Sequence, residues 1–349
     1  MKSERNDRTM ENKMYPLELV KELDKYIVGQ RAYKETVAMS IYTQCYKNSV
    51  NPIMVIGPTG SGKSFLFKVL MNSSLRPKDY TIMSTNISRL TEEGVHGQDI
   101  DDIFVEFKQL CEMERNHEYR GLIHIDEIDK LVYPSYVSSG NTNRNSIIQH
   151  QLMQILDGGT IAGVPTKNIL FVFSGAFHQL DELNKKEVRH NPIGFAATDT
   201  KEECVAIAKD TLRNDLLEVG FQREFLGRIN QIVKLNALTE KELKAILLHP
   251  SRGVISKLKQ NYASDGIDLV IEGDAIDGII KAVVSENLGA RSVSNIVETM
   301  LNGAWFHCIA NNLNQIVVDK EVIRGGKLKY NKVSVVIDKK EKKKIEKPA

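Results

Sequence analysis

The chain has 349 residues, of which 42% are hydrophobic and 26% are charged, and its formal net charge is +2 at pH 7. This length can form a sizeable core in one large domain or two ordinary ones, and the small charge excludes a protein that binds nucleic acid through its overall charge. No apolar run approaches the roughly 18 residues of a membrane span, and the opening residues lack the apolar core of a signal peptide. We therefore expect a cytoplasmic protein without a membrane partner.

The two ends and the cysteines add little further chemistry. Residues 1–13 and the basic end 341–349 are polar, which predicts disordered tails. A nucleic-acid arm is the alternative for the lysine-rich end. The cysteines lie far apart without a C-x-x-C pair, so we expect packed thiols and no zinc site. They are Cys45, Cys111, Cys204 and Cys308.

The first informative segment is a glycine-rich loop between a short apolar strand at 52–56 and a helix at 65–71. The loop matches the pattern G-x-x-x-x-G-K-[ST], whose backbone N–H groups cradle phosphates. Lys63 would reach the β- and γ-phosphates of ATP, and Ser64 would ligate Mg²⁺. A chance glycine-rich turn is the alternative. The nucleotide-binding residues predicted here are Gly57, Pro58, Thr59, Gly60, Ser61, Gly62, Lys63, Ser64 and Phe65.

Further along the chain, the segment 93–98 reads EGVHGQ, and its glycines predict a mobile exposed loop. The segment 121–130, GLIHIDEIDK, is an apolar strand that ends in Asp126 and Glu127. Ligands gather at the carboxyl ends of parallel strands, so both carboxylates should face the phosphate loop. Asp126 would hold the Mg²⁺ shell and Glu127 would polarise the attacking water, which indicates hydrolysis. Two solvated acids are the alternative, and His124 is expected to be a packed side chain.

The third apolar strand, at 167–177, ends at Ser174, whose hydroxyl could sense the γ-phosphate or orient water. The C-terminal part shows amphipathic runs at 240–249, 275–286 and 293–312, with short strands at 267–272 and 332–337. These predict a small, mostly helical domain. Trp305 and Phe306 are expected in its core.

The phosphate loop, the Asp-Glu strand and the serine strand, in this order, resemble those of AAA+ ATPases. Three flanking segments narrow the resemblance to the ClpX and HslU unfoldases, with ClpX the closer. These segments are LDKYIVGQ (23–30), REFLGRI (223–229) and LGARSVSNIVE (288–298). The likeness runs from about residue 15 to 337.

The resemblance implies a large α/β domain over 14–236, with a parallel sheet of strand order 5-1-4-3-2, and a small domain over 240–340. It places Ile27 and Val28 against the adenine, Arg228 in the site of a neighbouring subunit, and Arg291 on the nucleotide. It also implies a homo-hexamer that uses Mg-ATP and acts on protein substrates.

Two elements of ClpX are not found in this sequence. Only about 14 polar residues precede the ATPase region, where ClpX has a zinc-binding domain, and the basic loop expected after residues 158–165 is missing. The loop that grips substrate in ClpX and HslU contains an aromatic ring. Its counterpart here is Gly94, Val95, His96 and Gly97, without the ring.

The segment 190–200 occupies the position at which ClpX docks its peptidase. The matching tripeptide is Ile193, Gly194 and Phe195. A local hydrophobic anchor for the loop is the alternative to docking. Taken together, the motifs predict a ring-forming unfoldase that can deliver substrates to a ClpP-type peptidase. A disassembly ATPase without proteolysis, a nucleotide-dependent scaffold and a nucleic-acid motor remain as alternatives.

Overall fold

A computed structural model of the chain describes residues 15–74, 76–91, 100–133, 143–178, 180, 211–250, 252–285, 289–323 and 325–332. For Leu90, Thr91, Arg144 and Arg291 it describes the backbone alone. The chain divides into two compact units, residues 1–237 and residues 238–349, and each is described by itself. Across the described residues, no helix is both long and apolar enough to cross a membrane.

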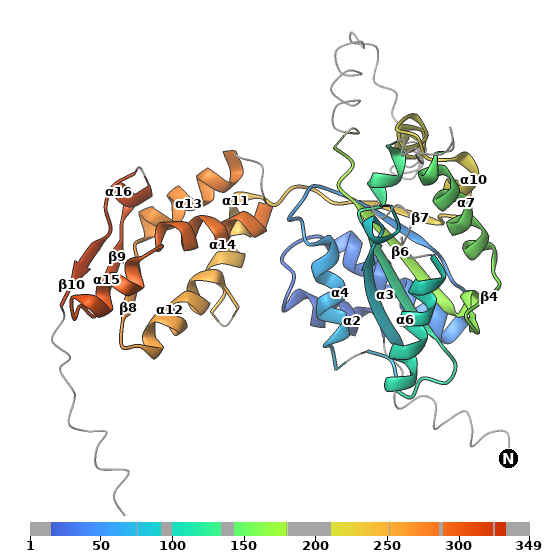
Figure 1. Cartoon of the computed structure of the whole chain (residues 1–349), viewed down its shortest axis with the longest axis horizontal. Coiled ribbons are helices and arrows are strands. Elements are labelled where there is room, and N and C mark those ends of the chain that lie inside the picture. The colour runs from blue at the N-terminus through green and yellow to red at the C-terminus, as the bar shows by residue number, and fades with distance from the viewer. Residues whose placement is uncertain are drawn as a thin grey trace, which may run out of the picture. The chain divides into compact units, whose positions relative to one another are not determined.

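The first unit, which contains the labelled strands β6 and β7 in Figure 1, is built on a five-stranded sheet with the order β2-β3-β6-β1-β7. All four neighbouring pairs are parallel. Numbered in chain order, this is the predicted order 5-1-4-3-2, and the predicted AAA+ fold class is confirmed. The strands are β1 (Ile53–Ile56), β2 (Thr81–Asn86), β3 (Gly121–Asp126), β6 (Ile169–Gly175) and β7 (Gln231–Lys234).

Helices cover both faces of this sheet, because alternate strand residues point to opposite sides and both sets are apolar. On one face, α2 (Pro16–Asp24), α3 (Arg31–Lys47) and α4 (Lys63–Met71) pack on residues such as Val55 and Val172. On the other face, α6 (Ile100–Met113), α7 (Arg144–Asp157) and α10 (Arg223–Gly227) pack on Met54 and Phe173. Shorter elements complete the unit: α5 (Ser88–Thr91), η1 (Ile128–Val132), η2 (Thr166–Asn168), β4 (Thr160–Ile161) and β5 (Val164–Pro165).

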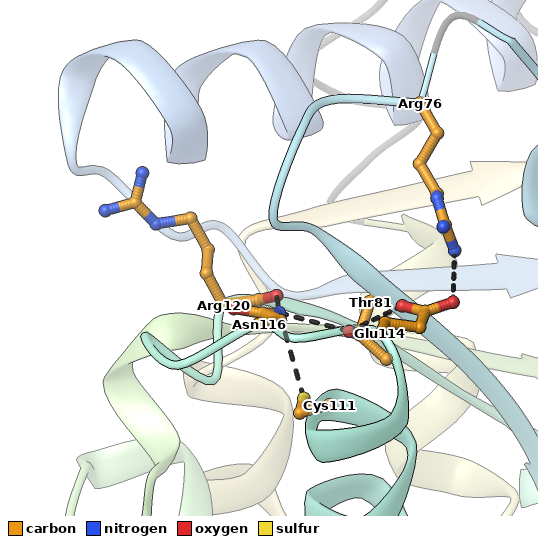
Figure 2. A network of polar contacts seen from close by, with 6 residues as sticks. All are labelled: Arg76, Thr81, Cys111, Glu114, Asn116 and Arg120. Atoms are coloured by element: carbon orange, nitrogen blue, oxygen red, sulfur yellow. Dashed lines mark hydrogen bonds and ion pairs between the residues drawn. The ribbon is translucent and has the colours of Figure 1, made fainter.

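A polar network secures the amino ends of β2 and β3 (Figure 2). Asn116 donates from Nδ2 to Thr81 Oγ1 at 3.0 Å and to the Arg120 carbonyl oxygen at 2.7 Å. Thr81 in turn donates to Glu114 at 2.8 Å, and Arg76 pairs with the same carboxylate at 2.7 Å. The Asn116 side-chain nitrogen, the Thr81 hydroxyl and the Arg120 carbonyl oxygen thereby have hydrogen-bond partners, whereas the buried Oδ1 of Asn116 has none among the described residues. The network helps to fix the register of two strands whose other ends carry the functional side chains.

The second unit holds a three-stranded sheet of order β10-β9-β8, in which β8 and β9 are parallel and β9 and β10 antiparallel. The predicted runs at 240–249 and 275–286 form helices, and strand β8 lies in the predicted segment 267–272. Residues 333–337 of the last predicted strand lie outside the described residues. The strands are β8 (Asp268–Ile271), β9 (Gln315–Val318) and β10 (Lys329–Asn331). The helices are α11 (Glu240–Leu247), α12 (Val254–Ser264), α13 (Gly273–Ser285), α14 (Gly289–Met300), α15 (Ala304–Ala310) and α16 (Lys320–Ile323).

The prediction that Trp305 and Phe306 are core residues is wrong. The amphipathic run at 293–312 is interrupted by Gly303, whose φ of 76° turns the chain between α14 and α15. In α15 the buried face consists of Ala304 and Cys308, four residues apart. Trp305 and Phe306 therefore flank that face and are 39% and 78% exposed.

Candidate nucleotide-binding site

The predicted phosphate loop connects the carboxyl end of β1 to the first turn of α4, which begins at Lys63. Three of its glycines have a structural reason. A Cβ on Gly57 would lie 2.7 Å from the Leu235 side chain, and Gly60 and Gly62 have φ values of 77° and 98°. The first N–H groups of a helix have no partner within the helix, and its dipole favours negative charge there. This loop therefore has the geometry of an anion site.

Lys63 is 8% exposed, and its ammonium group lies inside the curve of the loop. Nζ donates to the carbonyl oxygens of Gly57 at 2.5 Å and Pro58 at 2.9 Å. The buried Tyr33 donates its hydroxyl hydrogen to the Lys63 carbonyl oxygen at 2.8 Å, which ties helix α3 to the start of α4. A buried positive charge at this place favours the approach of phosphate oxygens.

Asp126 ends strand β3 and reaches the loop directly. Ser64 donates its hydroxyl hydrogen to Oδ2, Ser174 donates to Oδ1 at 2.5 Å, and the Glu127 N–H donates to Oδ1 at 3.0 Å. Burial alone would raise the pKa of Asp126, but the hydrogen bonds from Ser174 and Ser64 hold it below its ordinary value. An ionised carboxylate beside a hydroxyl is the kind of hard oxygen pair that suits Mg²⁺.

The structure thus brings together three predicted residues from three elements: Ser64, Asp126 and Ser174. The single hydroxyl hydrogen of Ser174 is engaged with the carboxylate of Asp126. Its contact with a γ-phosphate stays a prediction.

Glu127 follows Asp126 with a φ of 60°, in the left-handed region, so its side chain leaves the direction of the strand. Its carboxylate accepts from Ser88 at 2.9 Å and pairs with Lys130 at 2.8 Å. The hydrogen bond with Lys130 is the main reason that the pKa of Glu127 lies below its ordinary value. Since the side chain is 45% exposed, it is an ionised acceptor within reach of solvent.

His124 is fully buried, as predicted for a packed side chain, but it also hydrogen-bonds through both ring nitrogens. Nδ1 lies 2.8 Å from Ser84 Oγ, and Nε2 lies 2.8 Å from Ser174 Oγ. Burial lowers the pKa of His124 to about 4. The sequence reasoning missed these partners. The feature of the sequence that could have indicated these partners is the occurrence of polar residues at corresponding positions of neighbouring strands.

The segment predicted to face adenine is held by polar contacts. Lys34, 3% exposed, pairs with Asp24 and donates to the Ile27 carbonyl oxygen at 3.1 Å. Gln30 donates from its side chain to the Asn236 carbonyl oxygen at 2.9 Å. Ile27 is itself 5% exposed and packs in the core, whereas Val28 is half-buried. Val28 is therefore the one of the two with more side-chain surface available to a ligand.

Arg228 lies at the end of α10 and is bonded away from the loop. Its guanidinium forms a two-pronged pair with Asp157, Nε to Oδ1 at 2.5 Å and Nη2 to Oδ2 at 2.6 Å. A third nitrogen donates to the Glu224 carbonyl oxygen at 2.7 Å. The hydrogen bond raises the pKa of Arg228 and lowers that of Asp157. Within the described residues, no hydrogen bond or ion pair joins Arg228 to its own phosphate loop.

Three further predictions cannot be placed. Residues 94–97 and 193–195 lie outside the described residues, and the side chain of Arg291 does too, although its backbone is in α14. In the described part of the chain, no group of three His, Cys, Asp or Glu side chains is placed to hold a metal ion.

Comparison with known proteins agrees with this geometry. A family model described as "AAA domain (Cdc48 subfamily)" matches residues 48–232. The chain is 30% identical over 341 residues to the ATP-dependent Clp protease ATP-binding subunit ClpX of Treponema denticola, covering 88% of this chain and 81% of that protein. It is also 30% identical over 342 residues to the ClpX subunits of Borrelia duttonii and Borrelia recurrentis, covering 88% of this chain and 78% of each. With its phosphate loop, Asp-Glu strand and sheet order, the chain belongs to the AAA+ ATPases and resembles the ClpX subunits within them.

Proposed function

We propose that this ATPase is a ring-forming remodelling enzyme of the cytoplasm, which uses Mg-ATP to pull on protein substrates. The observation that carries the proposal is the setting of Asp126, an ionised carboxylate that bonds Ser64 at the loop and is followed by the exposed carboxylate of Glu127. In this pair, Asp126 would bind the cation and Glu127 would activate the water. Hydrolysis needs both.

Each residue has a distinct task in this proposal. The N–H groups of the loop and Lys63 hold the phosphates, Ser64 and Asp126 hold Mg²⁺, and Glu127 polarises the attacking water. A bound magnesium ion would neutralise charge on the phosphate oxygens. Ile27 and Val28 line the adenine side, where Lys34 fixes the backbone. We also propose that Arg291 contacts the nucleotide.

In this proposal, the protein must form a ring because Arg228 acts on the nucleotide of a neighbouring subunit. Among the described residues, the Arg228 guanidinium is bonded to Asp157 and not to its own phosphate loop, which supports a role at the nucleotide of a neighbouring subunit. A guanidinium offers a fixed fork of donors that suits phosphate oxygens. We propose a homo-hexamer, in which each active site combines Lys63 and Glu127 of one subunit with Arg228 of the next subunit.

Capture of substrates tests the remodelling function. A Glu127→Gln ring kept in ATP should retain bound proteins that mass spectrometry identifies, and exchange into ADP should release them. A Lys63→Ala ring is the matched control, because without firm phosphate binding it should capture few of the same proteins. A captured protein should then lose native structure when wild type and ATP are added. Binding of the same set by all three proteins, with or without nucleotide, would contradict the proposal.

A second prediction concerns the way in which residues 94–97 contact the substrate. We propose that Val95 and His96 contact substrate in the central pore, but with less area than a tyrosine ring, which can bury about 150–250 Å². Val95→Tyr should therefore speed the unfolding of a stable captured substrate severalfold at similar ATP consumption, and His96→Ala should slow it. The measurement is single-turnover loss of fluorescence from a stable domain fused to that substrate. An unchanged rate in Val95→Tyr, together with no cross-link from residue 95 to substrate, would exclude this loop as the gripping element.

The tripeptide at 193–195 sets a third expectation, that a ClpP-type peptidase docks there. Ile193→Ala combined with Phe195→Ala should abolish co-purification with the peptidase and leave basal ATPase activity within about twofold of wild type. The physical reason is that two apolar side chains in a polar segment supply contact area to a partner and none to the nucleotide. Loss of ATPase activity or of thermal stability in the double variant would mean that the tripeptide anchors the loop instead.

A second candidate function is disassembly of complexes without proteolysis. The absence of an aromatic side chain at residues 94–97 favours it, because a weaker grip suits loosely held assemblies more than stable domains. The two candidates differ in the fate of the captured protein. A peptidase partner would degrade it, whereas disassembly would leave intact, separated subunits.

A further inference from the structure

Polar side chains from three adjacent strands form a continuous chain of hydrogen bonds that ends on Asp126. Ser84 of β2 and His124 of β3 are direct partners in the sheet register, 2.8 Å apart through Nδ1. His124 is the register partner of Val172 in β6, so Ser174, two residues further along, lies on the same face. Nε2 of His124 lies 2.8 Å from Ser174 Oγ, which donates to Asp126 Oδ1 at 2.5 Å.

The direction of these hydrogen bonds follows from the Asp126 end. An ionised carboxylate can only accept, so the one hydrogen of the Ser174 hydroxyl goes to Oδ1. The Ser174 oxygen must then accept from His124, which places a proton on Nε2. In a neutral imidazole Nδ1 is left as an acceptor, and Ser84 donates to it. The donors therefore run one way, from Ser84 through His124 and Ser174 to Asp126.

The imidazole ring of His124, in the middle of this series of hydrogen bonds, is also held by aromatic stacking. It stacks on Phe67 of the phosphate-loop helix α4, with ring centroids 4.0 Å apart and an interplanar angle of 18°. Both His124 and Ser174 are 0% exposed, so neither hydroxyl nor ring can exchange its partner for bulk water. Ser84 at the outer end is exposed.

The consequence concerns the orientation of the Asp126 carboxylate. Oδ1 accepts from Ser174 and from the Glu127 N–H, whereas Oδ2 accepts from Ser64. The two oxygens therefore have different surroundings, one directed into the sheet and the other toward the loop. While Oδ1 accepts both of these hydrogen bonds, the Asp126 carboxylate has little freedom to rotate.

We propose that His124 is a positioning residue for the ATPase: acting through Ser174, it fixes the rotation of Asp126 so that Oδ2 and Ser64 together face the divalent cation. This rests on the proposed Mg-ATP site at Ser64 and Asp126. Residues that orient a metal ligand in this way typically change metal affinity or activity by about 10–100-fold when they are replaced.

The first test needs neither nucleotide nor turnover. Magic-angle-spinning NMR of the sedimented full chain, with ¹⁵N-labelled histidine, reports which ring nitrogen of His124 is protonated, and the His124→Gln spectrum identifies its signals. We expect a proton on Nε2, and a shifted Nε2 signal in Ser174→Ala. An unprotonated Nε2 in the wild-type protein would mean that Ser174 donates to the ring and not to Asp126, and would overturn the proposal.

The second test compares two substitutions at the same position. His124→Phe keeps the ring stacked on Phe67 but removes both hydrogen bonds, and His124→Gln keeps an N–H donor near the place of Nε2. His124→Phe should raise the Mg²⁺ concentration for half-maximal ATPase activity by about tenfold. His124→Gln should stay within about twofold of wild type. Binding of a fluorescent ATP analogue in EDTA should be unchanged in both, because the phosphate loop is intact.

Two outcomes would overturn the positioning role. One is a folded His124→Phe protein, with wild-type thermal unfolding, whose Mg²⁺ dependence is also that of wild type. The other is equal impairment of both variants, which would mean that the imidazole serves packing alone. If the wild-type chain shows no Mg²⁺-dependent hydrolysis at all, the proposed site itself fails, and the NMR result still decides whether the hydrogen-bond chain runs toward Asp126.

Discussion

Glu127→Gln is expected to lower ATP turnover by about a hundredfold or more while nucleotide binding stays close to that of wild type. The phosphate loop, Ser64 and Asp126 are untouched, and an amide of the same shape can still accept from Ser88. What is lost is the negative charge that polarises water, and general-base assistance typically contributes about 10²–10⁴-fold. The measurement is phosphate release at saturating Mg-ATP, together with the dissociation constant of a fluorescent nucleotide.

Two variants separate this effect from general damage. Lys63→Ala should weaken nucleotide binding itself, because the buried ammonium group lies within the loop. Glu106→Gln removes a glutamate of α6 that pairs with Arg89, and it should leave both turnover and binding unchanged. If Glu127→Gln and wild type release phosphate at the same rate, Glu127 does not activate the water.

Local sequence patterns predicted the strands, the loop and the helix that form the candidate nucleotide site. The loop at 57–64 and the carboxylate of Asp126 each follow an apolar strand, and parallel strands bring their carboxyl ends together. The partners of those residues were harder to predict. His124 meets Ser84 and Ser174 only because of the sheet register, which adjacent residues in the sequence do not specify.

The failures also have physical causes. The pairing of Arg228 with Asp157 joins residues 71 positions apart, and nothing in either local sequence indicates it. The mistaken burial of Trp305 and Phe306 came from extending one helical period across Gly303, where the chain turns. Hydrophobic periodicity locates a helix, but it does not reveal that the helix restarts with a different face buried.

Arg228→Ala is expected to lower ATP turnover by about a thousandfold or more without weakening nucleotide binding, if the arginine acts on the neighbouring subunit. An arginine finger stabilises the charge of the transition state and is worth about 10³–10⁵ in rate in well-studied NTPases. Arg228→Lys should recover little of this, because an ammonium group lacks the fork of donors. Turnover of the assembled ring at saturating Mg-ATP is the measurement.

The bond with Asp157 provides the matched control. An exposed ion pair contributes little to stability, about 0–1 kcal/mol, so Asp157→Asn should keep most of the activity if the work of Arg228 lies at the neighbour. Equal loss in Asp157→Asn and Arg228→Ala would mean that Arg228 matters for holding α7 to α10 within its own subunit.

Mixed rings give the decisive comparison. Arg228→Ala subunits retain Glu127, and Glu127→Gln subunits retain Arg228, so a mixed ring contains some interfaces where an intact base meets an intact arginine. Turnover should therefore rise above that of either variant alone and peak near equal mixing. A ring in which the arginine acted on its own nucleotide would recover nothing at any ratio, because every subunit would lack one of the two groups. Co-assembly, checked by co-purification of a tagged variant with an untagged one, makes that absence of recovery interpretable.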